Sequence, residues 1–300
     1  MINILTDSAA SLPDELAASE NVEVVSLYIN EDGKELPDTM GATAAFYDRL
    51  PSLIDHLPTS SQPSQHVFED IFNRAAQAGN EVLGVFLSSK LSGTFEGALR
   101  AARAVKAHHI NFHAVLVDSA SAGYDQAYAV LEAARASRAG KTLDQCARAA
   151  CDAIVRSRFL FAPESLTYLQ KGGRIGGAKA LVGNLIKLAP VLTVRDGSPI
   201  DVAKVRTQKK VLAAMLERFK EDVEHNGLAE VVIHYIGKPD KARVWAHDMV
   251  EPYLGHAVAV QPVSPVVGLH VGPAIGIAYR CERPLKEKLS GDVSSLLACV

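Results

Sequence analysis

The sequence predicts an α/β protein of two domains, with a mostly parallel sheet in the N-terminal one. Short apolar segments alternate with helical patterns from residue 2 to residue 156, as in parallel sheets with right-handed crossovers. After Ser157 the pattern changes and a hairpin signal appears. The 300 residues suffice for two domains. We therefore expect domains over residues 1–157 and 158–300.

Apolar runs and helix-start signals define the N-terminal elements. Pro13, followed by Asp14 and Glu15, begins a predicted helix, because acidic residues suit the positive end of the helix dipole. Ser64 is a predicted N-cap, since apolar residues follow it at helical spacing. Strands are predicted at 2–5, 22–29, 82–87 and 114–117, and further helices at 92–108, 125–138 and 143–156.

The C-terminal part is predicted to contain fewer helices and more strands than the N-terminal part. Asp196-Gly197 between two apolar segments predicts a hairpin. Pro163 to Ser165 opens a short predicted helix, and a glycine-rich loop follows at residues 172–177. Strands are predicted at 159–161, 190–195, 200–206, 231–236, 257–260 and 274–279, with an amphipathic helix at 207–225.

Composition excludes several classes of function. The net charge is −3 with the 10 histidines neutral, so non-specific nucleic-acid binding is not expected. The four cysteines form no Cys-x-x-Cys pair, which argues against a structural zinc site and a disulfide framework. His108, His109 and His113 lie at a predicted helix end without a carboxylate, so we expect no metal site there.

The N-terminal segment predicts a buried strand. This segment has no basic region of the kind that begins a signal peptide. Elsewhere in the sequence, no apolar run approaches the ~20 residues that a membrane span needs. We expect a cytoplasmic protein with reduced thiols.

Polar clusters follow three of the predicted parallel strands. They are Thr6-Asp7-Ser8, Ser88-Ser89 with Ser92-Gly93-Thr94, and Asp118-Ser119. Ligands of open parallel sheets bind outside the carboxyl ends of the strands, so the set favours a ligand site there. Any one cluster alone is better explained by the preference of Ser, Asp and Gly for loops and caps. For Asp7 and Asp118 we favour capping over catalysis.

Two loops and one histidine are candidates for holding an anion. The loop at 172–177 matches neither a Walker motif nor a dinucleotide fingerprint; with Arg174 at its centre it is either an anion site or a structural turn. The polar loop at 60–64 offers hydroxyls and amides. Ser92 lacks the Gly-x-Ser-x-Gly context of a hydrolase nucleophile. His270 between Gly268 and Gly272 is either structural or poorly shielded and able to contact a ligand.

Six segments in order resemble the DegV family of bacterial fatty-acid-binding proteins. The resemblance runs from residue 6 to residue 273. The segments are Thr6-Asp7-Ser8-Ala9-Ala10-Ser11-Leu12-Pro13, Ser61-Gln62-Pro63-Ser64, Ser88-Ser89-Lys90-Leu91-Ser92-Gly93-Thr94, Asp118-Ser119, Tyr168-Leu169-Gln170-Lys171-Gly172-Gly173-Arg174-Ile175 and Gly268-Leu269-His270-Val271-Gly272-Pro273.

The resemblance implies a lipid between two α/β domains, with a long-chain fatty acid held by its carboxylate. It implies a carrier subunit without chemistry or cofactor of its own, which presents the fatty acid to an ATP-dependent fatty acid kinase subunit for phospholipid synthesis. A transient contact with a membrane or an acyltransferase is a further expectation. Carried over by motif, the ligand-binding residues are Ser60, Ser61, Ser92, Gly93, Thr94, Arg174 and His270.

The chain departs from the family pattern at two places. Ser60 stands where the family usually has Thr, and Thr59 is an alternative source of that hydroxyl. Gly272-Pro273-Ala274 replaces the usual Gly-Pro-Gly. Arg174 contacts either the ligand or the kinase subunit.

The energetics of a lipid carrier agree with a site that lacks a nucleophile. At ~0.8 kcal/mol per buried methylene, a sixteen-carbon tail supplies about 12 kcal/mol before the costs of association. Two alternatives remain open. One is an acyl hydrolase or transferase with Ser92 as nucleophile and His270 as base, and the other is a sensor of another small acid.

Overall fold

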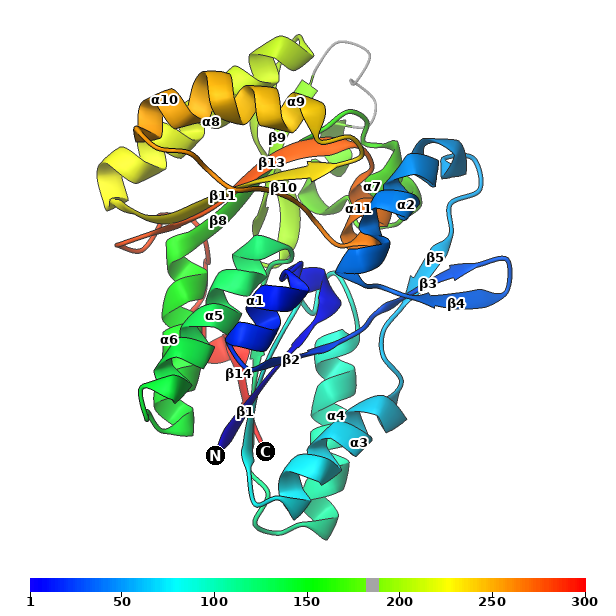
Figure 1. Ribbon diagram of the computed structural model, residues 1–300, viewed down its shortest axis with the longest axis vertical. Coiled ribbons are helices and arrows are strands. Elements are labelled where there is room, and N and C mark those ends of the chain that lie inside the picture. The colour runs from blue at the N-terminus through cyan, green and yellow to red at the C-terminus, as the bar shows by residue number, and fades with distance from the viewer. Residues whose placement is uncertain (182–188) are drawn as a thin grey trace.

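The computed structural model describes residues 1–181 and 189–300, which form three sheets with helices around them (Figure 1). The α/β class and the mostly parallel N-terminal sheet are confirmed. In the described part of the chain, the helices are too short or too polar to cross a bilayer.

The first sheet has the order β14-β7-β6-β1-β2, in which only β14 runs antiparallel to its neighbour. Its central strands β1, β6 and β7 are largely buried on both faces: α5 and α6 cover one face, and α3 and α4 the other (Figure 1). The bounds are β1 Ile2–Asp7, β2 Val22–Val25, β6 Glu81–Phe86, β7 Ala114–Asp118, β14 Leu297–Cys299, α1 Asp14–Ser19, α3 Gln65–Gln77, α4 Thr94–His108, α5 Tyr124–Arg138 and α6 Leu143–Arg156.

The second sheet has the order β10-β9-β8-β13-β11-β12 and is mostly antiparallel. Asp196 and Gly197 join β9 to β10 with φ of 50° and 79°, as expected for an Asp-Gly hairpin. Its outer face packs against α8 and α9 around Phe219 and Trp245. The bounds are β8 Ser157–Pro163, β9 Ala189–Arg195, β10 Ser198–Val205, β11 Leu228–Ile236, β12 Val260–Pro262, β13 Ala274–Cys281, α8 Gln208–Asn226, α9 Asp240–Trp245 and α10 Glu251–Leu254, with a π-helical turn at Ala246–Val250.

A third, antiparallel sheet of order β4-β3-β5 projects beside the first (Figure 1). Together with α2, α7 and α11 it adjoins the inner face of the second sheet, and apolar side chains from all of them share one core. The bounds are β3 Tyr28–Glu31, β4 Lys34–Pro37, β5 Thr59–Ser61, α2 Thr43–Arg49, α7 Thr167–Lys171 and α11 Pro265–Val271; short 3-10 turns span Ser8–Ala10, Met40–Ala42, Leu50–Leu53, Gly176–Leu181 and Val293–Leu296.

Three expected elements differ in the structure. The single strand predicted at 22–29 is two strands in different sheets, because Leu27 leaves the first ladder and its backbone N–H donates to Ser8 Oγ. The strand predicted at 257–260 spans Val260–Pro262. The segment around His270, for which no helix was predicted, is the helix α11, in which Val266, Val267 and Leu269 are buried.

The chain crosses between the first and second sheets twice. Ser157 begins β8, the first strand of the second sheet. After Cys281 the chain returns, and β14 pairs with β7 in the first sheet. The division into domains at residue 157 stays a prediction, and the C-terminal strand contributes to the sheet of the other half.

Candidate functional site

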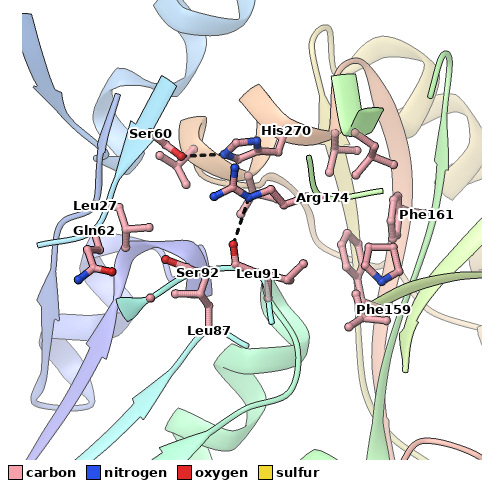
Figure 2. Close-up of a pocket in the computed structure, with 18 of the residues that line it drawn as sticks. Leu27, Ser60, Gln62, Leu87, Leu91, Ser92, Phe159, Phe161, Arg174 and His270 are labelled. Atoms are coloured by element: carbon pink, nitrogen blue, oxygen red, sulfur yellow. Dashed lines mark hydrogen bonds between the residues drawn. The ribbon is translucent and has the colours of Figure 1, made fainter. Parts of the chain in front are cut away.

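A cavity of about 330 Å³ lies where the first sheet, the third sheet, α11 and the inner face of the second sheet meet. A volume of this size is in the range of small-molecule sites. Polar groups gather on one part of its wall, as Figure 2 shows for Ser60, Ser92, Arg174 and His270. The polar lining residues are Ser60, Ser61, Gln62, Ser92, Gly93, Arg174 and His270, and the apolar ones are Leu27, Leu87, Leu91, Ala122, Phe159, Phe161, Leu169, Val194, Pro199, Val266, Val267 and Val271.

Ser60 and His270 are brought together from segments 210 positions apart. Ser60 Oγ lies 2.8 Å from His270 Nε2 (Figure 2). β5 holds Ser60 by pairing it with Ile29 of β3. Helix α2 fixes the helix that carries His270, because the Tyr47 hydroxyl donates to Val263 O at 2.8 Å. Thr59 is exposed and outside the cavity, so Ser60 supplies the hydroxyl at this point.

The imidazole of His270 is neutral at physiological pH. Burial, with a smaller contribution from the positive charge of Arg174, lowers its pKa to about 4. Among the described residues Nδ1 has no hydrogen-bond partner. Buried N–H groups without an acceptor are rare, so we assign the proton to Nε2, which then donates to Ser60 Oγ. The Ser60 hydroxyl proton is thereby left for a ligand oxygen.

Ser92 stands at the start of α4, after the strand β6. Thr94 N donates to Ser92 Oγ at 3.4 Å, and the two hydroxyl oxygens lie 2.9 Å apart. Thr94 is fully buried and does not line the cavity, so it supports Ser92 and offers no group of its own to a ligand. Gly93 is the N-cap of α4 and lines the cavity. A Cβ on Gly93 would lie 2.3 Å from Gln62 Oε1, so a side chain at this position would require the Gln62 amide to move.

Arg174 crosses from the glycine-rich segment to the loop that carries Ser92. Its Nε donates to Leu91 O at 3.1 Å (Figure 2), and its Nη1 donates to Gly172 O at 2.6 Å. The expectation that the amides of this loop hold an anion is not supported at Gly172, Gly173 and Arg174. Their N–H groups donate to Tyr168 O, Gln170 O and Leu169 O. The guanidinium of Arg174 is the group that this segment brings to the cavity.

The polar clusters at the carboxyl ends of β1 and β7 are structural. Asp7 accepts from Leu87 N at 2.7 Å and from Ala9 N at 3.0 Å, and Asp118 accepts from Ala120 N at 2.8 Å. Neither carboxylate lines the cavity. The three clusters do meet at one sheet edge, but only Ser92 and Gly93 reach the ligand space.

Sequence reasoning did not identify the apolar wall or Gln62. Phe159 and Phe161 are two positions apart on β8, so both point inward, an alternation that was visible in the sequence. Gln62 lies inside the polar loop that was singled out, but its neighbours gave no sign of which side chains face inward.

The site is arranged for binding more than for nucleophilic attack. A serine nucleophile needs a histidine base, which is in turn oriented by a carboxylate at its other nitrogen. Within the described chain, the hydroxyl of Ser92 contacts Thr94 and not His270, and Nδ1 of His270 has no partner. The neutral hydroxyls, the imidazole and Arg174 form a set of donors suited to a carboxylate.

Comparison with known proteins identifies one family. The model of the DegV family matches residues 1–282. A DegV domain-containing protein of Clostridium acetobutylicum is 36% identical over 286 residues, which cover 95% of this chain and 99% of that protein.

Solved structures agree in fold along nearly the whole chain. A fatty-acid-binding DegV family protein of Thermus thermophilus has a TM-score of 0.83 and 27% identity, covering 93% of this chain and 99% of that one. A fatty-acid-binding DegV family protein of Streptococcus agalactiae has a TM-score of 0.81 and 26% identity, covering 94% and 99%.

Proposed function

Because the chain belongs to the DegV family, we propose that it binds a long-chain fatty acid in the cavity described above. The carboxylate lies against Ser60, Ser92 and His270, and the acyl chain lies along the apolar wall. The observation that carries the proposal is that the Ser60–His270 pair and Ser92 line one cavity of about 330 Å³ whose remaining wall is mostly apolar. The similar proteins of Thermus thermophilus and Streptococcus agalactiae, which are described as fatty-acid-binding, support the proposal.

The chemistry of the site supports a carrier. Two hydroxyls and a neutral imidazole orient a carboxylate without attacking it, and the apolar wall supplies most of the affinity at ~0.8 kcal/mol per buried methylene. Arg174 lines the cavity, which favours a contact with the carboxylate. We further propose that the protein is cytoplasmic and presents the carboxylate to an ATP-dependent kinase subunit, which converts it to an acyl phosphate.

Native mass spectrometry followed by denaturation and extraction tests the binding. We expect a bound species of fatty-acid mass that is lost or sharply reduced in the Ser92→Ala/His270→Ala double variant. Thr59→Ala is the control, because it removes an exposed hydroxyl next to Ser60 and outside the cavity. A protein that carries no fatty acid and takes up none when it is added would refute the proposal.

The same preparations test the presentation step. The loaded protein is incubated with ATP and the kinase subunit of a bacterial fatty acid kinase, and acyl phosphate is trapped as a hydroxamate. We expect product only when carrier, kinase and ATP are all present. Fatty-acid binding without any acyl phosphate would support the binding role and refute presentation to the kinase.

A further inference from the structure

The inference rests on the proposed function and concerns the far end of the ligand. We propose that Phe159 sets the length of the acyl chain, because its ring is the wall against which the terminal methyl stops. In Figure 2, Phe159 and Phe161 lie across the cavity from Ser60 and Gln62. A fatty acid anchored by its carboxylate at Ser60 and Ser92 therefore extends toward these two rings.

The ring of Phe159 belongs to a rigid wall. It is 4% exposed and stacks on Phe161, with ring centroids 5.2 Å apart and an angle of 22° between the planes. Both side chains leave the same face of β8, which is a central strand of the second sheet. Their backbone is held by neighbours on both sides, so the wall does not recede as a loop would.

Two glycines fit closely around this ring. A Cβ on Gly276 of β13 would lie 2.7 Å from Phe159 Cε2, and one on Gly123 would lie 3.6 Å from Phe159 Cε1. The absent side chain of Gly276 leaves the room that the ring occupies, whereas a Cβ at Gly123 would be in ordinary van der Waals contact with it. An acyl chain therefore cannot push the ring toward Gly276 without moving β13.

The environment changes from apolar to polar behind the ring. His234 of β11 packs edge-on against Phe159 at 5.8 Å between centroids, and Tyr124 lies 5.5 Å from His234. His234 is 1% exposed, and its Nε2 has no hydrogen-bond partner among the described residues. A methyl end gains little in such surroundings, whereas the phenyl ring separates this imidazole from the apolar cavity.

The proposal predicts a sharp optimum of chain length. Up to the wall, each added methylene tightens binding roughly fourfold, and beyond it the gain stops or reverses. A smaller side chain at residue 159 moves the wall back. We expect Phe159→Leu to lengthen the preferred saturated fatty acid by about two carbons, with roughly a tenfold gain for the longer chain over the unchanged protein.

The experiment measures affinities of saturated fatty acids from about ten to twenty carbons, for the unchanged chain and for Phe159→Leu, after each is stripped of lipid. Phe159→Met is the second variant in case Phe159→Leu folds poorly. Phe68→Leu is the matched control, because Phe68 is fully buried in the core that α3 and α4 form with the first sheet and does not line the cavity. We expect it to lose stability without a shift in the optimum.

The outcomes separate this inference from the proposed function. A longer optimum in the residue 159 variants alone supports the wall. An unchanged optimum in variants that still bind fatty acids overturns it and leaves the proposed function intact. No binding of any fatty acid by the unchanged chain overturns both.

Discussion

At the residue scale, the site depends on the protonation of His270. Its pKa is lowered to about 4, first by burial and then by Arg174, so the imidazole is neutral when the cavity is empty. A ligand carboxylate beside it favours the protonated form, because opposite charges stabilise each other. The pKa of His270 therefore rises when the ligand binds.

The sign of the pH dependence follows from this rise. A group whose pKa is higher in the complex takes up a proton on binding, so affinity increases as pH falls. We expect fatty-acid affinity to rise as the pH falls through the raised pKa of the complex toward about 4, by up to roughly tenfold per unit of pKa rise. Titration calorimetry in two buffers of different ionisation enthalpy measures the proton uptake.

His270→Gln is the control for this prediction. It keeps a hydrogen-bonding side chain near Ser60 and cannot titrate, so its affinity should change less with pH than that of the unchanged chain. Equal pH dependence in the two proteins would show that His270 does not take up the proton.

At the element scale, two short helices approach each other through their terminal glycines. Gly172 ends α7, and a Cβ there would lie 2.5 Å from His270 Nδ1. Gly272 ends α11, and a Cβ there would lie 2.1 Å from the Tyr168 ring. Each helix thus places a side chain against the glycine of the other, and this contact fixes where His270 stands.

Gly172→Ala tests the contact directly. Gly172 has φ −72° and ψ −9°, so alanine fits its backbone and the only conflict is with its neighbours. We expect the added methyl to push the imidazole from Ser60 and to weaken fatty-acid binding by roughly tenfold, the loss of about one hydrogen bond. Binding assays and thermal unfolding measure the two effects separately.

Gly173→Ala is the neighbouring comparison. A Cβ at Gly173 meets no atom within 4 Å, but its φ of 72° strains alanine. Its variant should lose stability and keep affinity. If both variants lost only stability, the α7–α11 contact would have no role in the site.

At the scale of the whole molecule, a buried ion pair ties the returning C-terminal segment to the first half of the chain. Lys288 Nζ contacts Asp125 of α5, and the side chains are 2% and 1% exposed. Asp125 also accepts from Ser121 Oγ at 2.5 Å and from Ser157 Oγ at 2.6 Å. These contacts gather α5, β8 and the segment leading to β14 around one carboxylate.

Removing the cation leaves this carboxylate buried and uncompensated. We expect Lys288→Met to lower the free energy of unfolding by about 3 kcal/mol, measured by urea denaturation. The double variant Lys288→Met/Asp125→Asn should recover part of the loss. Lys286→Met, at an exposed position nearby, should have little effect. Equal stability of the two single variants would contradict the role of the pair.

The sequence by itself determined the alternation of strands and helices, the Asp-Gly hairpin, the N-cap at Ser64 and the family to which the chain belongs. These depend on side-chain period and local hydrogen bonds, which neighbours along the chain decide. The motifs also located most polar residues of the cavity, including Ser60, Ser92, Arg174 and His270.

Only the tertiary structure decided which of these groups meet. The pairing of Ser60 with His270 depends on the third sheet and α11, and neither was predicted. Thr94 and the clusters at Asp7 and Asp118 resemble site residues in sequence, yet they bond to other protein groups and do not themselves line the cavity. Local composition cannot tell a hydroxyl that faces a cavity from one that caps a loop, because that difference is set by contacts between segments distant in the chain.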